Sequence, residues 1–252
     1  MNASFYSQCG EDRILAGIFN NKPSGTCMEI GALDGVKDSI TLHFEEQGWS
    51  CILVEANPEL AEKAKRNRHA LVFSCAAGCQ PGTVEFLIAQ GAEYLSTMIA
   101  TDQNVSRIKN DGATVKRLNV PVRRADDILQ QAQVQSLDFV TVDVEGAELE
   151  VLHGFNLHKW KPRVLVVENN SGGHDRRVRR YLQSEGYRCF LNDQLNDWYA
   201  AKDDRELLTP KRVLAQYRRQ IRIRLYEWTV GLLPVRTQEK IVKWKRHWLG
   251  EL

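Results

Sequence analysis

The stretch of residues 26–35 constrains the fold more than any other part of the sequence. It begins as an apolar run over residues 26–30 and passes directly into a turn that contains Gly31 and Gly35. Glycine lets a backbone bend sharply and pass close to a ligand. We expect a buried strand, a tight turn and then a helix over residues 38–47. This arrangement would place a nucleotide-sized site at the carboxyl edge of a parallel sheet.

Two acids at predicted strand ends indicate which nucleotide would bind. Glu29 stands where the dinucleotide fingerprint G-x-G-x-x-G has a glycine. A carboxylate there would repel a pyrophosphate and attract a cation, such as the α-amino group of S-adenosylmethionine. Glu55 ends the next predicted strand, residues 51–55, where a ribose diol would lie. Together the two acids favour a nucleoside ligand over a purely structural turn.

Length and composition favour one main domain. The chain has 252 residues, of which 43% are apolar, and this is enough for one α/β domain with a full core. We expect that domain over residues 1–210, with a separate segment over residues 211–252. No apolar run approaches the roughly 18 residues of a membrane span, and no signal-peptide pattern begins the sequence. The six cysteines form no Cys-x-x-Cys pair, so we expect free thiols and a cytoplasmic location.

The remaining predicted strands complete a doubly wound sheet. Further core strands are expected over residues 70–75, 137–142 and 163–168, and an antiparallel pair is expected over residues 186–191 and 197–200. With the two strands above, this makes seven strands in a Rossmann-like sheet with helices on both faces. Residues 83–88 and 118–123 suggest edge strands. The aperiodic residues 89–116 between them are a candidate lid or substrate loop.

Polar groups also follow the later strands. Asp143, Glu168 and Asn169 would meet at adjacent strand ends, where their oxygens could ligate a divalent metal such as Mg²⁺ or bind substrate hydroxyls. Glu145 and His174 join Asp143 and Glu168 as candidate catalytic residues, and the histidine has an unperturbed pKa suited to a general base. The assignment of the base stays open among these four.

Four motifs carry a resemblance to a known family. They cover residues 7–12 (Ser-Gln-Cys-Gly-Glu-Asp), 29–35 (Glu-Ile-Gly-Ala-Leu-Asp-Gly), 54–58 (Val-Glu-Ala-Asn-Pro) and 143–154, which begins Asp-Val-Glu-Gly-Ala-Glu. Over roughly residues 4–200 the chain resembles the FkbM family of S-adenosylmethionine-dependent methyltransferases. The resemblance and the strand ends together predict cofactor contacts at Gln8, Glu29, Gly31, Ala32, Asp34, Gly35, Glu55, Ala56, Ala76, Ala77 and Asp143.

The resemblance implies methyl transfer, most often to an oxygen, on macrolides, sugars or other small molecules. DNA-base amino-methyltransferases carry Asn/Asp-Pro-Pro-Tyr/Phe after the fourth strand, whereas residues 143–146 here are Asp-Val-Glu-Gly. The acids around the expected site would also repel phosphates, so a nucleic-acid partner is not expected. A nicotinamide oxidoreductase is disfavoured by Glu29. A cofactor-binding scaffold without catalysis remains an alternative.

Residues 211–252 differ from the rest in charge. They hold 11 basic against 3 acidic residues, or +8, whereas residues 1–210 hold 23 against 29, or −6. Apolar residues recur at helical spacing in two segments separated by Pro234, first at Leu214, Tyr217, Ile221, Leu225, Trp228 and Leu232, and then at Ile241, Trp244 and Trp248.

Such helices suit an anionic membrane surface. Alternatively, their apolar faces could dock on the domain itself or on a second subunit in a homodimer. A peripheral enzyme at the inner face of a bacterial membrane would suit O-methylation of a sugar hydroxyl on a glycan or lipid-linked saccharide. The alternative acceptor is a soluble, macrolide-like small molecule.

Overall fold

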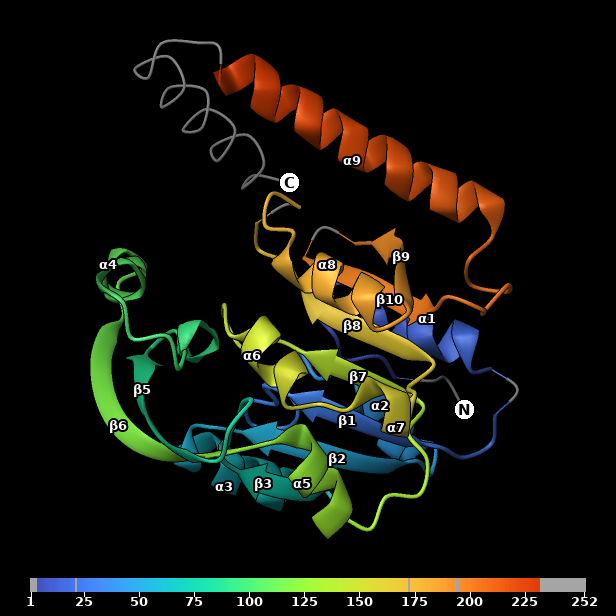
Figure 1. Cartoon of the computed structure of the whole chain (residues 1–252). Helices are drawn as coiled ribbons and strands as arrows, with labels where there is room; N and C mark the ends of the chain where they lie inside the picture. The colour runs from blue at the N-terminus through green and yellow to red at the C-terminus, as the bar shows by residue number, and fades with distance from the viewer. Residues whose placement is uncertain (1–3, 21, 172, 194, 232–252) are drawn as a thin grey trace.

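A seven-stranded sheet forms the centre of the computed structural model, which describes residues 4–20, 22–171, 173–193 and 195–231 (Figure 1). Its strand order is β3-β2-β1-β7-β8-β10-β9. The strands are β1 (Thr26–Ile30), β2 (Ser50–Glu55), β3 (Leu71–Ser74), β7 (Phe139–Val142), β8 (Val164–Glu168), β9 (Tyr187–Asn192) and β10 (Asn196–Ala201). β10 runs antiparallel to β8 and β9, and the other pairings are parallel. The predicted seven-strand sheet is confirmed.

The central strands form because their sequences suit burial on both faces. β1, β2 and β8 are near-continuous apolar runs, and Met28, Leu53 and Leu165 in them are fully buried. Runs of this kind are typical of parallel strands covered by helices on either side. Burying each of these large side chains stabilises the fold by about 1.5–3 kcal/mol.

Helices cover both faces of the sheet, as the sequence predicts (Figure 1). On one face α5 (Ala125–Gln131), α6 (Glu148–His153), α7 (Leu157–Trp160) and α8 (Arg177–Ser184) bury apolar residues against the strands. On the other face, α1 (Glu11–Ile18) and α2 (Leu42–Glu46) contribute to a second core, and α3 (Pro58–Asn67) packs against β2.

The helix expected over residues 38–47 begins later than predicted, at Leu42. Asp38 has a φ of 56°, which is incompatible with a helical position. Thr41, at the N-cap position, makes no capping hydrogen bond with its side chain, whereas Ser39 Oγ accepts from the N–H of Leu42 at 3.2 Å. The hydroxyls of Ser39 and Thr41 both donate to the carboxylate of Glu29. The carboxylate of Glu29 therefore organises the turn that the prediction assigned to the helix.

A second, three-stranded sheet stands beside the first. β4 (Ala76–Ala77), β6 (Thr114–Arg123) and β5 (Gly82–Gln90) lie in the order β4-β6-β5. The two predicted edge strands are thus longer than expected and pair with each other in this small sheet. The segment between them, which seemed aperiodic in sequence, contains the 3₁₀ helix η1 (Glu93–Leu95) and the helix α4 (Asp102–Asn110).

The chain continues beyond the sheet as the helix α9 (Pro210–Gly231), which lies along the β9 edge (Figure 1). The first predicted tail helix is therefore present. The predicted break at Pro234 and the second apolar segment with Ile241, Trp244 and Trp248 lie outside the described residues. Among residues 4–231, apart from the gaps given above, no helix is both long and apolar enough to span a bilayer.

Candidate active site

Gly31 allows the ends of β1 and β7 to approach each other closely. Its φ is 95°, and a Cβ atom built on it would lie 1.8 Å from the carbonyl oxygen of Asp143. The amide of Asp143 donates to the carbonyl oxygen of Ile30 at 2.9 Å, which fixes the two strand ends side by side. Any side chain at position 31 would push these strand ends apart.

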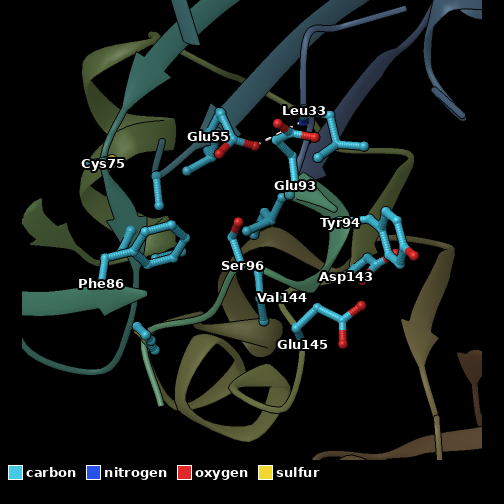
Figure 2. Close-up of a pocket in the computed structure, with 17 residues that line it drawn as sticks. Leu33, Glu55, Cys75, Phe86, Glu93, Tyr94, Ser96, Asp143, Val144 and Glu145 are labelled. Atoms are coloured by element: carbon cyan, nitrogen blue, oxygen red, sulfur yellow. Dashed lines mark hydrogen bonds between the residues drawn. The ribbon is translucent and has the colours of Figure 1, made fainter. Parts of the chain in front are cut away.

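Leu33 and Glu55 link the first glycine turn to the end of β2. Leu33 has a φ of 49°, and its N–H donates to a carboxylate oxygen of Glu55 at 2.8 Å (Figure 2). The other carboxylate oxygen accepts from the N–H of Asn57 at 2.7 Å. Burial raises the pKa of Glu55 to about 7, although these backbone hydrogen bonds oppose the shift. The carboxylate is thus held in one orientation at the pocket wall.

The strand-end pocket is the cavity at the carboxyl ends of β1, β2 and β7. Gly31, Glu55 and Ala56 line it from the main sheet, and Asp143 lines it from the end of β7. The opposite wall comes from the small sheet and its connecting segment, with the apolar side chains Cys75, Ala76, Ala77, Phe86 and Met98. The pocket therefore combines a flat apolar wall with an oriented carboxylate.

Several predicted cofactor residues lie outside this pocket. Both oxygens of Glu29 have partners in the protein, because they accept from Ser39 Oγ, the N–H of Ile40 and Thr41 Oγ1. Asp34 accepts from the N–H groups of residues 36 and 37.

Two further predicted residues act in packing. Ala32 packs against Leu53 and Ala64 in the core. The carbonyl oxygen of Gly35 accepts from the guanidinium of Arg68 at 2.6 Å. These residues support the turn without lining the strand-end pocket.

A carboxylate cluster lies at the ends of β7 and β8. Asp143, Glu145 and Glu168 each offer an oxygen, and these atoms lie within 4.8 Å of one another. Asp143 keeps accessible surface in the opening, yet protein atoms surround its carboxylate closely. Burial, followed by mutual repulsion, raises the pKa of Glu145 and, most strongly, of Glu168. Burial also raises the pKa of Asp143, so the cluster retains protons near neutral pH.

Glu145 is held in place from the segment between β5 and β6. Its carboxylate accepts from Arg107 of α4 at 2.7 Å, and its carbonyl oxygen accepts from Thr97 Oγ1 at 3.0 Å. Its backbone adopts a φ of 55°, which is unfavourable for a residue with a side chain. Such a conformation persists only where neighbouring contacts impose it, and here Thr97 and Arg107 supply them.

The carboxylate cleft adjoins the strand-end pocket and contains the three clustered acids. It is further lined by polar and aromatic groups from five separate segments, namely Gln8, Lys37, Tyr94, Arg107, Asn170 and Asn196. Asp143, Glu145 and Tyr94 line both cavities. Figure 2 shows Glu145 and Tyr94 around the opening of the strand-end pocket. The two cavities therefore meet at these three side chains.

The first motif places Gln8 in this cleft rather than in the strand-end pocket. Asp12 is fully buried and accepts from Ser7 Oγ at 2.6 Å and from the backbone N–H groups of Tyr6 and Ser7. Glu11 accepts from Asn196 of β10 at 2.9 Å. The two acids thus fold the N-terminal segment against the sheet and carry Gln8 to the cleft.

Asn169 and His174 lie apart from the carboxylate cluster. The amide of Asn169 donates to Asp197 at 2.8 Å, and its oxygen accepts from Ser171. The structure therefore groups Glu145, and not Asn169, with Asp143 and Glu168 as possible metal ligands. His174 is exposed, and its ring lies 6.2 Å from that of Tyr226 in α9.

Sequence reasoning missed several residues of the two cavities. Tyr94 and Arg107 lie in the segment predicted as a candidate lid or substrate loop, as does Met98, so the lack of periodicity of residues 89–116 was the available signal. Phe86 carried no such signal, because its role depends on how the small sheet packs over the strand ends. Lys37 lies directly before the helix predicted over residues 38–47, where no motif singled it out.

The strand order and this position of the cavities define the class of Rossmann-like methyltransferases. Comparison with known families agrees, since the sequence model of the "Methyltransferase FkbM domain" matches residues 29–189. This match covers more than half of the chain. The chain belongs to the FkbM methyltransferase family, and this membership implies S-adenosylmethionine as the cofactor.

Individual relatives are distant. The chain is 26% identical over 160 residues to "2-O-methyltransferase NoeI" of Sinorhizobium fredii, a match that spans 58% of this chain and 64% of NoeI. Among solved structures, the METTL16 methyltransferase domain is 13% identical with a TM-score of 0.44, covering 77% of this chain and 66% of that one. M. capricolum TrmK, solved with S-adenosylhomocysteine, is 10% identical with a TM-score of 0.41, covering 96% and 98%.

Proposed function

We propose that the protein binds S-adenosylmethionine in the strand-end pocket and transfers its methyl group to a hydroxyl oxygen in the carboxylate cleft. The observation that carries this proposal is the junction of the two cavities at Tyr94, Asp143 and Glu145. Methyl transfer needs the donor and the acceptor to meet in line across one boundary. A cavity pair that shares three side chains supplies such a boundary.

The strand-end pocket suits the cofactor's chemical groups. Glu55 can accept from the ribose hydroxyls, because each of its oxygens has a second lone pair beyond the backbone hydrogen bond. The small residues Ala76 and Ala77 leave space for the adenine ring. Glu93 and Asp143 line the pocket and can meet the cationic amino group, whereas the carboxylate of Glu29 is occupied by the Ser39–Thr41 turn.

The carboxylate cluster suits proton removal from a hydroxyl. Bound S-adenosylmethionine supplies an activated methyl group as part of a sulfonium, so the protein must position the acceptor and take up its proton. A carboxyl group with a raised pKa is a stronger base once ionised than an ordinary one. Glu145 lies at the junction, with Asp143 beside it and Arg107 keeping it partly ionised, and we assign it the role of general base.

The cleft favours a saccharide acceptor. It combines five acidic side chains, three of them in the carboxylate cluster, and three side-chain amides with one half-exposed tyrosine ring, Tyr94. Carboxylate and amide oxygens accept from vicinal hydroxyls, and an aromatic ring covers the apolar face of a sugar. The name of NoeI, a 2-O-methyltransferase, agrees with a hydroxyl acceptor. We therefore propose a sugar hydroxyl on a glycan or lipid-linked saccharide, with a soluble small molecule or a non-catalytic scaffold as the alternatives.

The same three acids could hold a divalent cation, because Mg²⁺ prefers hard oxygen ligands. If a metal lowers the pKa of the acceptor hydroxyl, chelation with EDTA will abolish transfer and Mg²⁺ will restore it. Transfer that is unchanged in EDTA would leave proton removal to the carboxylates alone.

Calorimetric titration of S-adenosylhomocysteine tests the cofactor site. We expect micromolar binding to the wild-type protein and at least about tenfold weaker binding to Glu55→Ala, since the oriented carboxylate is lost. Glu62→Ala, on the exposed side of α3, is the matched control and should bind normally. Absence of binding to folded wild-type protein would overturn the proposal.

A transfer assay tests the reaction. The protein would be incubated with methyl-labelled S-adenosylmethionine and extracted lipid-linked saccharides, and the products would be located by mass spectrometry. Label on a sugar oxygen supports the proposal, and label confined to soluble small molecules would support the alternative acceptor. Binding of the cofactor without transfer to either pool would indicate a scaffold.

A further inference from the structure

One side of α9 packs against the domain. Arg219 lies 3.7 Å from Asp197, and the guanidinium of Arg212 stands 5.6 Å above the ring centre of Phe190. Gln216 approaches the thiol of Cys189 at 3.8 Å. These contacts hold the helix against β9 and β10 through polar side chains.

The opposite side of α9 exposes an apolar stripe. Leu214, Tyr217, Ile221 and Leu225 recur every three or four residues, and their exposed fractions are 46%, 62%, 40% and 55%. Residues at this spacing lie on one face of a helix. The sequence left open whether this apolar face docks on the protein's own domain. In the structure these four side chains are exposed, so they do not dock there.

Cations border the stripe. Lys211, Arg218 and Arg222 lie on one side of it and Arg224 lies on the other, as follows from 3.6 residues per turn. All four are exposed. Residues 211–226 contain six basic residues and no Asp or Glu, so the helix segment that carries the stripe is itself strongly positive.

We propose that this face of α9 binds an anionic membrane surface. Apolar side chains would enter the interface between headgroups and acyl chains, while the bordering cations would meet lipid phosphates. A second copy of the chain is a poor occupant, because two such faces would bring eight cations together. An anionic bilayer can bury the apolar stripe and pair the bordering cations with lipid phosphates.

The position of α9 relates this surface to the carboxylate cleft. His174 and Tyr226 lie side by side, and the loop that carries His174 follows Glu168 and Asn170, which line the cleft. A membrane on the outer side of α9 would hold the enzyme on the same surface as a membrane-anchored acceptor. This step, which rests on the proposed function, favours an acceptor that is anchored in the membrane.

Vesicle sedimentation with the full chain tests the surface itself. The protein would be mixed with vesicles of phosphatidylcholine alone or with phosphatidylglycerol added, and no substrate is required. We expect binding only to the anionic vesicles, with release at high salt because surface charges are then screened. Because this assay needs no substrate, a protein that does not bind vesicles is distinguished from a protein that does not transfer methyl groups.

Two double variants locate the binding face. Ile221→Gln with Leu225→Gln removes part of the stripe, and Arg218→Glu with Arg222→Glu reverses part of its border. Each should weaken binding to anionic vesicles at least about tenfold. The matched controls are Leu71→Gln, which changes an exposed leucine on β3, and Lys63→Glu with Arg66→Glu on α3. Both controls should bind like the wild type.

Three outcomes would overturn the proposal. The first is wild-type protein that ignores anionic vesicles, and the second is binding that both α9 variants leave unchanged. The third is a dimer, detected by light scattering, that Ile221→Gln with Leu225→Gln dissociates, since a second copy would then cover the stripe. Thermal unfolding of each variant shows whether the domain itself is intact.

Discussion

The strand-end pocket and the carboxylate cleft meet at three side chains but are built in different ways. In the pocket, the main acid, Glu55, has a backbone N–H on each oxygen, and most of the wall is apolar. In the cleft, three acids share a small space, and Arg107 supplies one cationic contact to them. The pocket is therefore arranged for binding at low energetic cost, whereas the cleft stores electrostatic repulsion that a proton, a cation or a substrate can relieve.

The difference lies in what surrounds each carboxylate: backbone donors hold Glu55, whereas the acids of the cleft also repel one another. Glu55 has a backbone N–H on each oxygen, so its carboxylate is oriented for a ligand, and burial raises its pKa to about 7. A carboxylate among like charges is unstable when ionised, and this makes it a better proton acceptor at neutral pH. Each of the predictions below changes the pocket, the cleft or the residue that joins them.

The largest effect is expected for Gly31→Ala, because Gly31 joins the two regions. A Cβ atom would overlap the carbonyl oxygen of Asp143, and the φ of 95° would be strained as well. We expect a loss of about 3 kcal/mol or more in the free energy of unfolding, measured by urea denaturation.

Gly17→Ala is the matched control for this variant. Gly17 lies in α1 with open space around it, so alanine should stabilise the helix by about 0.5–1 kcal/mol. Equal stability of Gly31→Ala and the wild type would show that the strand ends can separate without cost.

Glu145→Gln should separate the chemistry of the cleft from the binding of the pocket. We expect the rate of methyl transfer to fall at least about 100-fold, because the proton acceptor is removed. The dissociation constant for S-adenosylhomocysteine should stay within about threefold of the wild-type value. Glu150→Gln, on the exposed side of α6, should be active. An active Glu145→Gln would move the role of base to Asp143 or Glu168.

Glu168→Gln should relieve the repulsion in the cleft. The folded protein raises the pKa of Glu168 above 4.5, so it holds this proton more tightly than the unfolded chain does. Wild-type stability must then decrease as the pH rises above that value. The variant should lose this decrease and be more stable by about 1–2 kcal/mol at pH 8, in denaturation across a pH series. Asp203→Asn is the surface control, and a lower stability of Glu168→Gln would contradict the interpretation.

Arg107→Ala should have the smallest effect. Arg107 lowers the pKa of Glu145, but its side chain is 45% exposed, so solvent weakens the interaction. Without it the acidic limb of the pH–rate profile should move to higher pH, and the rate at pH 7 should fall about two- to fivefold.

At high pH the rate of Arg107→Ala should return towards that of the wild type. Arg117→Ala breaks a comparably exposed ion pair with Glu85, away from the site, and should leave the profile unchanged. A uniform loss of rate for Arg107→Ala at every pH would indicate a role in binding the acceptor instead.

The sequence was sufficient to predict the main sheet and the site residues at the ends of its strands. Strands such as β1 and β8 are predictable because a continuous apolar run is required wherever both faces are buried. Gly31 and Glu55 were predictable because turn geometry and strand-end position are local properties. The same local signals identified the acids that follow β7 and β8.

Tertiary structure decided what those side chains contact. Glu29 carries the expected charge at the expected position, yet its carboxylate is taken up by Ser39, Ile40 and Thr41. The sequence placed Asn169 beside Asp143 and Glu168, but the packing of β10 directs its amide to Asp197. Side-chain orientation depends on partners that are distant in sequence, so spacing alone does not determine it.

The C-terminal helix α9 shows the same division. Amphipathic spacing alone determined that residues 211–231 form a helix with one apolar and one basic side. Only the packing on β9 and β10 decided that Arg212 and Arg219 face inwards while Leu214 and Ile221 face solvent. The periodicity of a helix is a local property of the chain, whereas the direction in which its faces point is set by the surface it meets.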